Sequence, residues 1–324
     1  MKNAKQYIFI FILIIFVFII IKKYKKSNNY FLSLDDSINI MTNEEYFTHF
    51  NNYDYKLRKC FDINNCKSKY LENVLEFSNN EKNVLTDMLN QFLNKLTKYQ
   101  KIFLNLKLIK VGNYIESTLP HTRKTAIVLS QKWITQFVSR NINNNRFITL
   151  ISHEQFHIFQ RYNPQLMEDL YTNYWNMIKY NKLPPKLMAI NRTNPDALPN
   201  NIWLFPIGIG KGDTKEYKKY ILPLCIYDTK NNSSIRDTKN VYFNLEKKGN
   251  KIEFSNLNEE IKNQNLLSQS KEFRDFFGSE TSNNYHPNEL SASLFEIIID
   301  KHLDNMDLPN IPAIHKFEEF LKNL

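Results

Sequence analysis

Apolar and polar positions along the chain follow helical spacing in some stretches and strand-like spacing in others, which predicts an α+β fold. Residues 43–110 carry apolar side chains at helical spacing with few helix breakers. Residues 125–129 are apolar and largely β-branched, as in a buried strand, and a helix is expected over 131–140. Helical spacing returns at 288–303 and 313–322. The pattern therefore predicts a helix-rich domain with a small mixed sheet.

The middle of the chain changes from helix to strand. Helices are predicted over 146–161 and 165–180, with Asn163-Pro164 as the break between them. Residues 183–201 are rich in Pro and Asn and are expected to form a loop. Residues 202–254 read mostly as strands and include a hairpin. We expect this last stretch to be a β-rich insertion in the helical domain.

The N-terminus carries the longest apolar run of the sequence. Residues 8–21 are apolar without interruption, and lysines bracket the run. This pattern predicts a transmembrane helix, and hence a single-pass membrane protein that contacts the lipid bilayer. A cleaved signal peptide is the alternative. However, residues 22–26, which are four lysines and one tyrosine, occupy the place where a cleavage site of small residues would be. The predicted organisation is an anchor at 1–26, a tether at 27–42 and a globular domain at 43–324.

Composition and charge narrow the function classes. The 324 residues are 42% hydrophobic, which permits a large core, and only three are Cys, which excludes a disulfide scaffold. Six of the ten net positive charges lie in residues 1–26, so the rest of the chain carries about +4. We therefore expect no nucleic-acid partner.

The most specific chemical signal is the sequence His153-Glu154-Gln155-Phe156-His157, which matches H-E-x-x-H. On a helix, His153 and His157 lie one turn apart on the same face, where both imidazoles can bind one ion. Glu154 lies beside them and can take a proton from a water that Zn²⁺ activates. An opposite, apolar arc would anchor the helix in the core; it comprises Phe147, Ile148, Ile151, Ile158 and Phe159. A helix that binds no metal is the alternative.

A catalytic zinc needs a third protein ligand, and the other histidines and many carboxylates are candidates. Asn288-Glu289, preceded by Pro287, resembles the Asn-Glu pair that opens a helix in gluzincins, the thermolysin-like zinc metallopeptidases. The resemblance implies that Glu289 is the third ligand; His286 is its main rival. The H-E-x-x-H helix, this second helix and Asn194-Pro195-Asp196 between them are also similar to membrane-anchored or secreted zincin-like proteins of large viruses and bacteria.

The resemblance covers about residues 110–300 and has two departures. His157 and Glu289 are 132 positions apart, more than is usual in gluzincins, so the β-rich segment must be an insertion or a substrate-binding subdomain. The family tends to place an Asp four residues after the ligand Glu to orient a zinc-bound His. Here that residue is Ser293, although Glu296 lies on the same helical face.

The resemblance also suggests where substrate would bind. A strand at about 124–129, preceded by His121, corresponds to the edge strand that pairs with extended substrate in zincins, although a plain sheet strand is equally expected. Tyr285, Tyr174 or His286 could donate a hydrogen bond to the oxyanion of the tetrahedral intermediate. Among these we select Tyr285.

The sequence thus predicts a membrane-anchored zinc metallopeptidase of zincin-like α+β fold. Its ligands would be His153, His157 and Glu289, its general base Glu154, and its substrate a protein or peptide. Two alternatives stay open. One is a catalytically inactive, membrane-tethered binding or virion structural protein, and the other is a basic nucleic-acid binder.

Overall fold

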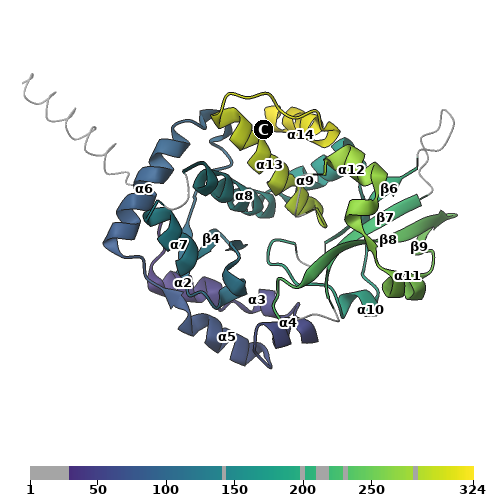
Figure 1. The fold of residues 1–324 in the computed structure, drawn as a ribbon, viewed down its shortest axis with the longest axis horizontal. Coiled ribbons are helices and arrows are strands. Elements are labelled where there is room, and N and C mark those ends of the chain that lie inside the picture. The colour runs from purple at the N-terminus through teal and green to yellow at the C-terminus, as the bar shows by residue number, and fades with distance from the viewer. Residues whose placement is uncertain (1–28, 141–143, 198–200, 209–218, 229–232, 280–283) are drawn as a thin grey trace, which may run out of the picture. The chain divides into compact units, whose positions relative to one another are not determined.

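Two separate β-sheets, each accompanied by helices, build the fold (Figure 1). The computed structural model describes residues 29–140, 144–197, 201–208, 219–228, 233–279 and 284–324. Phe31–Leu324 forms one compact unit. The combination of helices with two sheets confirms the α+β class.

The first sheet has four short strands in the order β1–β2–β4–β3. Their bounds are Val74–Leu75 (β1), Leu108–Val111 (β2), His121–Arg123 (β3) and Ala126–Ser130 (β4). β2 and β4 run parallel, while the other neighbours are antiparallel. All residues of β2 and β4 are buried, as is typical of strands covered on both faces.

Helices cover this sheet. α2 (Leu34–Met41), α3 (Glu44–Phe47) and α5 (Ile63–Glu72) contribute to a core cluster with the strands. α7 (Gln131–Val138) and α8 (Asn144–Tyr162) pack on β4. A disulfide joins Cys60 to Cys66 at the start of α5.

The second sheet corresponds to the predicted β-rich segment and is antiparallel throughout. Its order is β10–β8–β7–β6–β5, and β9 also pairs with β8. The bounds are Ile178–Tyr180 (β5), Ile202–Ile207 (β6), Lys219–Tyr227 (β7), Thr238–Lys248 (β8), Lys251–Phe254 (β9) and Asn265–Leu266 (β10). Strands over 202–254 are therefore confirmed.

α8 and α13 (Pro287–Leu303) lie side by side at the centre of the helical part (Figure 1). Phe156 of α8 is fully buried, stacks on Phe295 of α13 with 4.9 Å between ring centroids, and meets Phe317 of α14 edge-on. Gln155 donates to the Ile102 carbonyl at 3.0 Å. The other described helices are α4 (Asn52–Leu57), α6 (Asn79–Leu93), α9 (Pro164–Asp169), α10 (Pro185–Met188), α11 (Leu257–Asn263), α12 (Lys271–Phe277) and α14 (Pro312–Lys322).

The helix predicted over 165–180 is too long. α9 ends at Asp169, a π-helical turn follows at Leu170–Tyr174, and β5 begins at Ile178. Asn176 has a φ of 56°, a left-handed conformation that stops the helix. The residues after it pair with β6, so sheet formation overrides their helical spacing.

The strand predicted at 124–129 is not an edge strand. It corresponds to β4, which lies between β2 and β3, so β3 is the edge strand on this side of the sheet. Arg123 pairs with Ala126, and Lys124 and Thr125 form the turn between them. Lys124 takes a φ of 48° there.

The described structure contradicts the predicted transmembrane helix and the predicted membrane location. No helix in the described part of the chain is both long and apolar enough to cross a bilayer. The longest of these, α8, has 19 residues and carries His153, Glu154 and Arg161. Residues 1–26, where the anchor was predicted, lie outside the described residues.

Replacing Phe156 with Ala removes the ring that links α8 to α13 and α14. We expect Phe156→Ala to lower the free energy of unfolding by about 3–5 kcal/mol, because it leaves a cavity among buried aromatics. Urea unfolding followed by circular dichroism measures this. Leu104→Ala is the control, since Leu104 is 59% exposed and its loss should change stability by about 0.5 kcal/mol or less. A similar small loss for Phe156→Ala would contradict the packing described.

Candidate metal centre

Helix α8 holds His153, Glu154 and His157 at one buried site. They are 8%, 6% and 3% exposed. The Nε2 atoms of the two histidines are 3.2 Å apart. Apolar residues elsewhere on the helix fix its position in the core; Phe147, Ile151 and Phe156 are fully buried. Core packing therefore holds both imidazoles in place.

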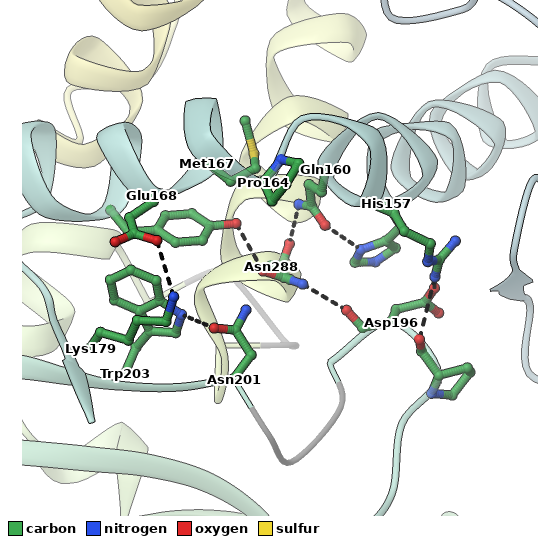
Figure 2. A pocket seen from close by; sticks show the side chains of 13 residues that line it. His157, Gln160, Pro164, Met167, Glu168, Lys179, Asp196, Asn201, Trp203 and Asn288 are labelled. Carbon is green, nitrogen blue, oxygen red and sulfur yellow. Dashed lines mark hydrogen bonds and ion pairs between the residues drawn. The ribbon is translucent and has the colours of Figure 1, made fainter. Parts of the chain in front are cut away.

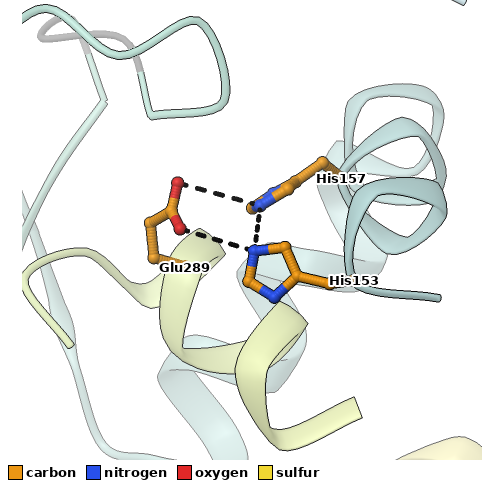
Figure 3. A group of neighbouring side chains, drawn as sticks. All are labelled: His153, His157 and Glu289. Carbon is orange, nitrogen blue, oxygen red and sulfur yellow. Dashed lines mark hydrogen bonds and ion pairs between the residues drawn. The ribbon is translucent and has the colours of Figure 1, made fainter. Parts of the chain in front are cut away.

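Helix α13 brings Glu289 to these imidazoles. Pro287 occupies its first turn, and the Nδ1 atom of His286 accepts a hydrogen bond from the Asn288 amide at 3.1 Å, which caps the helix. Glu289 follows in the first turn and is buried. Its Oε2 lies 3.7 Å from Nε2 of His153, and its Oε1 lies 3.7 Å from Nε2 of His157 (Figure 3).

The spacing of these three ligand atoms suits a metal ion. Ligand atoms around a tetrahedral zinc with ordinary bond lengths are about 3.3 Å apart. The observed separations of 3.2, 3.7 and 3.7 Å are close to that figure. The buried His, Glu and Asp groups at this place could therefore hold a metal ion. This confirms the predicted presence of a possible metal site here.

Hydrogen bonds from neighbouring side chains hold two of the three groups, His157 and Glu289. The Nδ1 atom of His157 lies 2.9 Å from Oε1 of Gln160, whose Nε2 donates to the Asn288 carbonyl at 2.8 Å. Since Gln160 Oε1 can only accept, His157 carries its hydrogen on Nδ1 and directs the Nε2 lone pair into the site. Asn194 Nδ2 donates to Oε1 of Glu289 at 2.6 Å.

A carboxylate also faces the outer nitrogen of His153. Oε2 of Glu296 lies 3.4 Å from its Nδ1, and Oε1 of Glu296 pairs with Arg146 at 3.0 Å. Ser293, where the gluzincin resemblance expects an orienting Asp, lies one turn earlier on α13. Glu296 thus occupies the position behind His153 that Ser293 cannot fill.

The electrostatics of the site favour a positive charge at its centre. Burial by itself would raise the pKa of Glu289, but the adjacent imidazoles of His157 and His153 bring that pKa down to about 2. Burial would lower the pKa of His153, yet Glu289 and Glu296 raise it well above its ordinary value. Burial lowers the pKa of His157.

Glu154, the third polar residue of α8 at this site, has fewer contacts than Glu289 in the described part of the chain. Its Oε2 is buried and has no hydrogen-bond partner in the described part of the chain. Burial raises the pKa of Glu154 well above its ordinary value, and the nearby carboxylates, led by Asp196, raise it further. A buried carboxylate without a donor is costly unless a ligand or an ion satisfies it.

A cavity of about 320 Å³ adjoins His157 (Figure 2). Apolar side chains from three elements form part of its wall, namely Met167, Tyr171 and Trp203. Its charged residues are paired with each other: Arg161 Nη2 with Asp196 at 3.4 Å, and Lys179 with Glu168 at 3.1 Å. The cavity therefore has no net charge from these four residues.

The other predicted residues lie further from the metal site. Both ring nitrogens of His286 are engaged, Nδ1 by the Asn288 amide and Nε2 by the Asn201 carbonyl at 2.6 Å. Tyr285 is buried, accepts from Asn194, and lines a separate small cavity. Tyr174 lies against α14, where its ring meets Phe320. Of the three proposed oxyanion donors, only Tyr285 shares a partner with a residue of the metal site.

Two contacts of the candidate ligands were not predicted from the sequence, namely those of Gln160 with His157 and of Asn194 with Glu289. Gln160 lies three residues after His157 on the same helix, so its position beside that imidazole follows from helical spacing. Asn194 is in a loop 95 positions from Glu289 and carries no such spacing signal.

Comparison with protein-family models, curated proteins and solved structures finds no match to this chain. Its function is therefore inferred from the geometry of the metal centre.

Removing any one of the three ligand side chains should abolish metal binding. We expect about one ion per chain in the wild-type protein after loading and dialysis, and almost none in His153→Ala or Glu289→Ala. Elemental analysis of the full-length protein measures this. His315→Ala, which alters an exposed histidine, is the control and should keep its metal. Full occupancy in Glu289→Ala would exclude Glu289 as a ligand.

Glu296→Gln tests the contact behind His153. The change keeps the shape of the side chain but removes its charge, so metal affinity should fall by about 10- to 100-fold. Competition with a chromophoric chelator gives the affinity. Glu318→Gln is a matched control, because both carboxylates are 26% exposed and ion-paired. Equal affinities in the two variants would show that Glu296 does not support the site.

Proposed function

We propose that this protein is a zinc-dependent peptidase of gluzincin type. The observation that carries the proposal is the joint position of His153, His157 and Glu289, whose ligand atoms lie within 4.8 Å of one another. Beside them, Glu154 adds a buried carboxylate oxygen that has no hydrogen-bond partner among the described residues. Three protein ligands and a nearby base are the composition of a catalytic zinc site.

Zinc is the ion that this donor set favours. Two neutral imidazoles and one carboxylate suit Zn²⁺ better than Mg²⁺ or Ca²⁺, which prefer sites made of oxygen atoms. When bound, zinc would lower the pKa of a water to about 7 and polarise a carbonyl group.

The residues of the chain would divide the remaining work. Glu154 would accept the proton of the attacking water and pass it to the amine that leaves when the peptide bond breaks. Its raised pKa suits a group that must both take and return a proton. Gln160, Asn194 and Glu296 would hold the ligands in position.

The cavity beside His157 supports a peptide as substrate. Its volume of about 320 Å³ suits one large side chain. Arg161 pairs with Asp196 and Lys179 with Glu168, so these four described residues offer no unpaired counter-ion to a charged side chain. Contacts with Met167, Tyr171 and Trp203 favour an apolar or aromatic residue.

The alternative of a catalytically inactive zincin-like binding or structural protein rests on Ser293 and on the predicted N-terminal anchor. Glu296 weakens the first of these reasons, since it lies within 3.4 Å of His153 and can serve the imidazole in place of the expected Asp. A peptidase therefore remains the better proposal.

Glu154→Gln separates catalysis from metal binding. We expect it to retain metal and fold while peptide hydrolysis falls by about 10²- to 10⁴-fold, because the amide cannot accept the proton. Cleavage of a quenched-fluorescent peptide library, with metal content measured on the same samples, tests this.

The matched control for that variant is Glu272→Gln, an exposed glutamate of α12 that should keep full activity. Hydrolysis that survives in Glu154→Gln would remove Glu154 as the base. Absence of cleavage by metal-loaded wild-type protein across the library would favour the inactive alternative.

A further inference from the structure

The guanidinium of Arg192 lacks a counter-ion in the described part of the chain. Its Nε atom is buried without a hydrogen-bond partner there, and no described carboxylate forms an ion pair with Arg192. The backbone beside it is fixed, because the Arg192 amide donates to the Cys225 carbonyl at 2.9 Å and Asn191 forms a β-bridge with Ile226. A cationic side chain is therefore held against the second sheet without a negative partner among the described residues.

The polar groups next to Arg192 supply no negative charge. The Cys225 thiol on β7 is 2% exposed, and burial raises the pKa of Cys225 more than the guanidinium lowers it, so the thiol stays neutral. Tyr285 is 7% exposed, and burial raises the pKa of its hydroxyl well above the ordinary value. Two described carboxylates act on Arg192 from further away, but Glu116 is already ion-paired at 2.8 Å and Glu289 faces the imidazoles of the metal centre.

A small cavity adjoins both Arg192 and Tyr285. Its volume is about 20 Å³, which admits one particle about the size of a water molecule. Part of its wall is apolar and includes Leu183 and Leu222. The Tyr285 hydroxyl accepts from Asn194, so its own hydrogen is free for another acceptor in the described structure. Together with the Nε–H of Arg192, two donors of the cavity residues therefore lack an acceptor among the described residues.

We infer that this cavity is a binding site for one small inorganic anion, with chloride as the ion that fits its size and charge. Chloride would accept hydrogen bonds from Arg192 and Tyr285 and would neutralise the guanidinium. A water molecule could accept the same hydrogens, but it would leave the buried cation without a compensating charge. Sulfate or phosphate needs more room than the cavity has. The site is separate from the three metal ligands, so the inference goes beyond the proposed function and does not depend on it.

The anion site is connected to the metal centre through Asn194. The amide of Asn194 donates to the Tyr285 hydroxyl and, at 2.6 Å, to Oε1 of Glu289. When an anion takes the hydrogen of Tyr285, a lone pair of this hydroxyl stays directed toward Asn194. The bound ion would thereby support the orientation of the amide that holds Glu289.

The stability of the full-length protein in different salts tests this inference, with the metal content held constant. Urea unfolding is followed in sodium chloride and in sodium gluconate at equal ionic strength, because gluconate is too large for the cavity. An anion at about ten times its Kd lowers the unfolding equilibrium constant about 10-fold, and we expect this effect from chloride only. Chloride NMR on the same samples should show a signal broadened by bound ion. No peptide substrate is used, so the outcome does not depend on whether the protein is a peptidase.

Two substitutions locate the bound ion. Arg192→Gln removes the charge and should abolish the chloride effect. Tyr285→Phe keeps the ring, removes one donor and should weaken chloride binding by about 10-fold. Arg140→Gln is the matched control, since it removes an exposed guanidinium and should leave chloride binding as in the wild type.

Equal unfolding of the wild type in the two salts, without a broadened chloride signal, would overturn the inference even if neither variant folds. An unchanged chloride effect in Arg192→Gln would also overturn it, because the ion would then lie elsewhere. A chloride effect that Arg192→Gln loses and Arg140→Gln keeps would support the anion site.

Discussion

The packing of α8 against α13 is the contact on which the metal centre depends. Phe156 of α8 and Phe295 of α13 stack at the interface of these helices, and Glu289 of α13 reaches two imidazoles of α8. Apolar contact thus sets the separation of the helices, while the polar groups determine what can lie between them. A shift of α13 by even 1 Å would be large compared with the tolerance of a metal–ligand bond.

Burial makes this arrangement unfavourable without a positive charge. Glu154, His153, His157 and Glu289 are all almost fully buried, and Glu154 has an oxygen without a donor in the described part of the chain. Placing carboxylates in a dry interior costs several kcal/mol each unless they are paired. A divalent cation would satisfy three of these groups at once, and it would also lower the electrostatic cost of keeping Glu154 nearby.

The second sheet and the N-terminal helices act on the centre through one loop. Residues 191–197 run from α10 toward β6, and they bind Asp54 and Arg58 on one side and Glu289 on the other. Thr193 and Asp54 are 139 positions apart, so only the completed fold can bring them together. The same loop places Asp196 beside Thr122 at the edge of the first sheet. Any movement of this loop would alter the surroundings of both Glu289 and β3.

The sequence by itself determined the α+β class, the longer helices, the strands β4 and β6 to β9, and the position of His153 and His157 on one helical face, because these follow from local periodicity. It missed β1, β2 and β5, which form by pairing with strands distant in the sequence. It overextended the helix after Asn163 and misplaced the sheet edge, because pairing of β5 with β6 and of β2 with β4 is non-local. The resemblance to gluzincins suggested Glu289, which the fold does bring to both imidazoles. Only the tertiary structure decided that Glu296 faces His153 and that Asn194 binds Glu289. Those contacts join residues 143 and 95 positions apart, and no spacing along the chain encodes such distances.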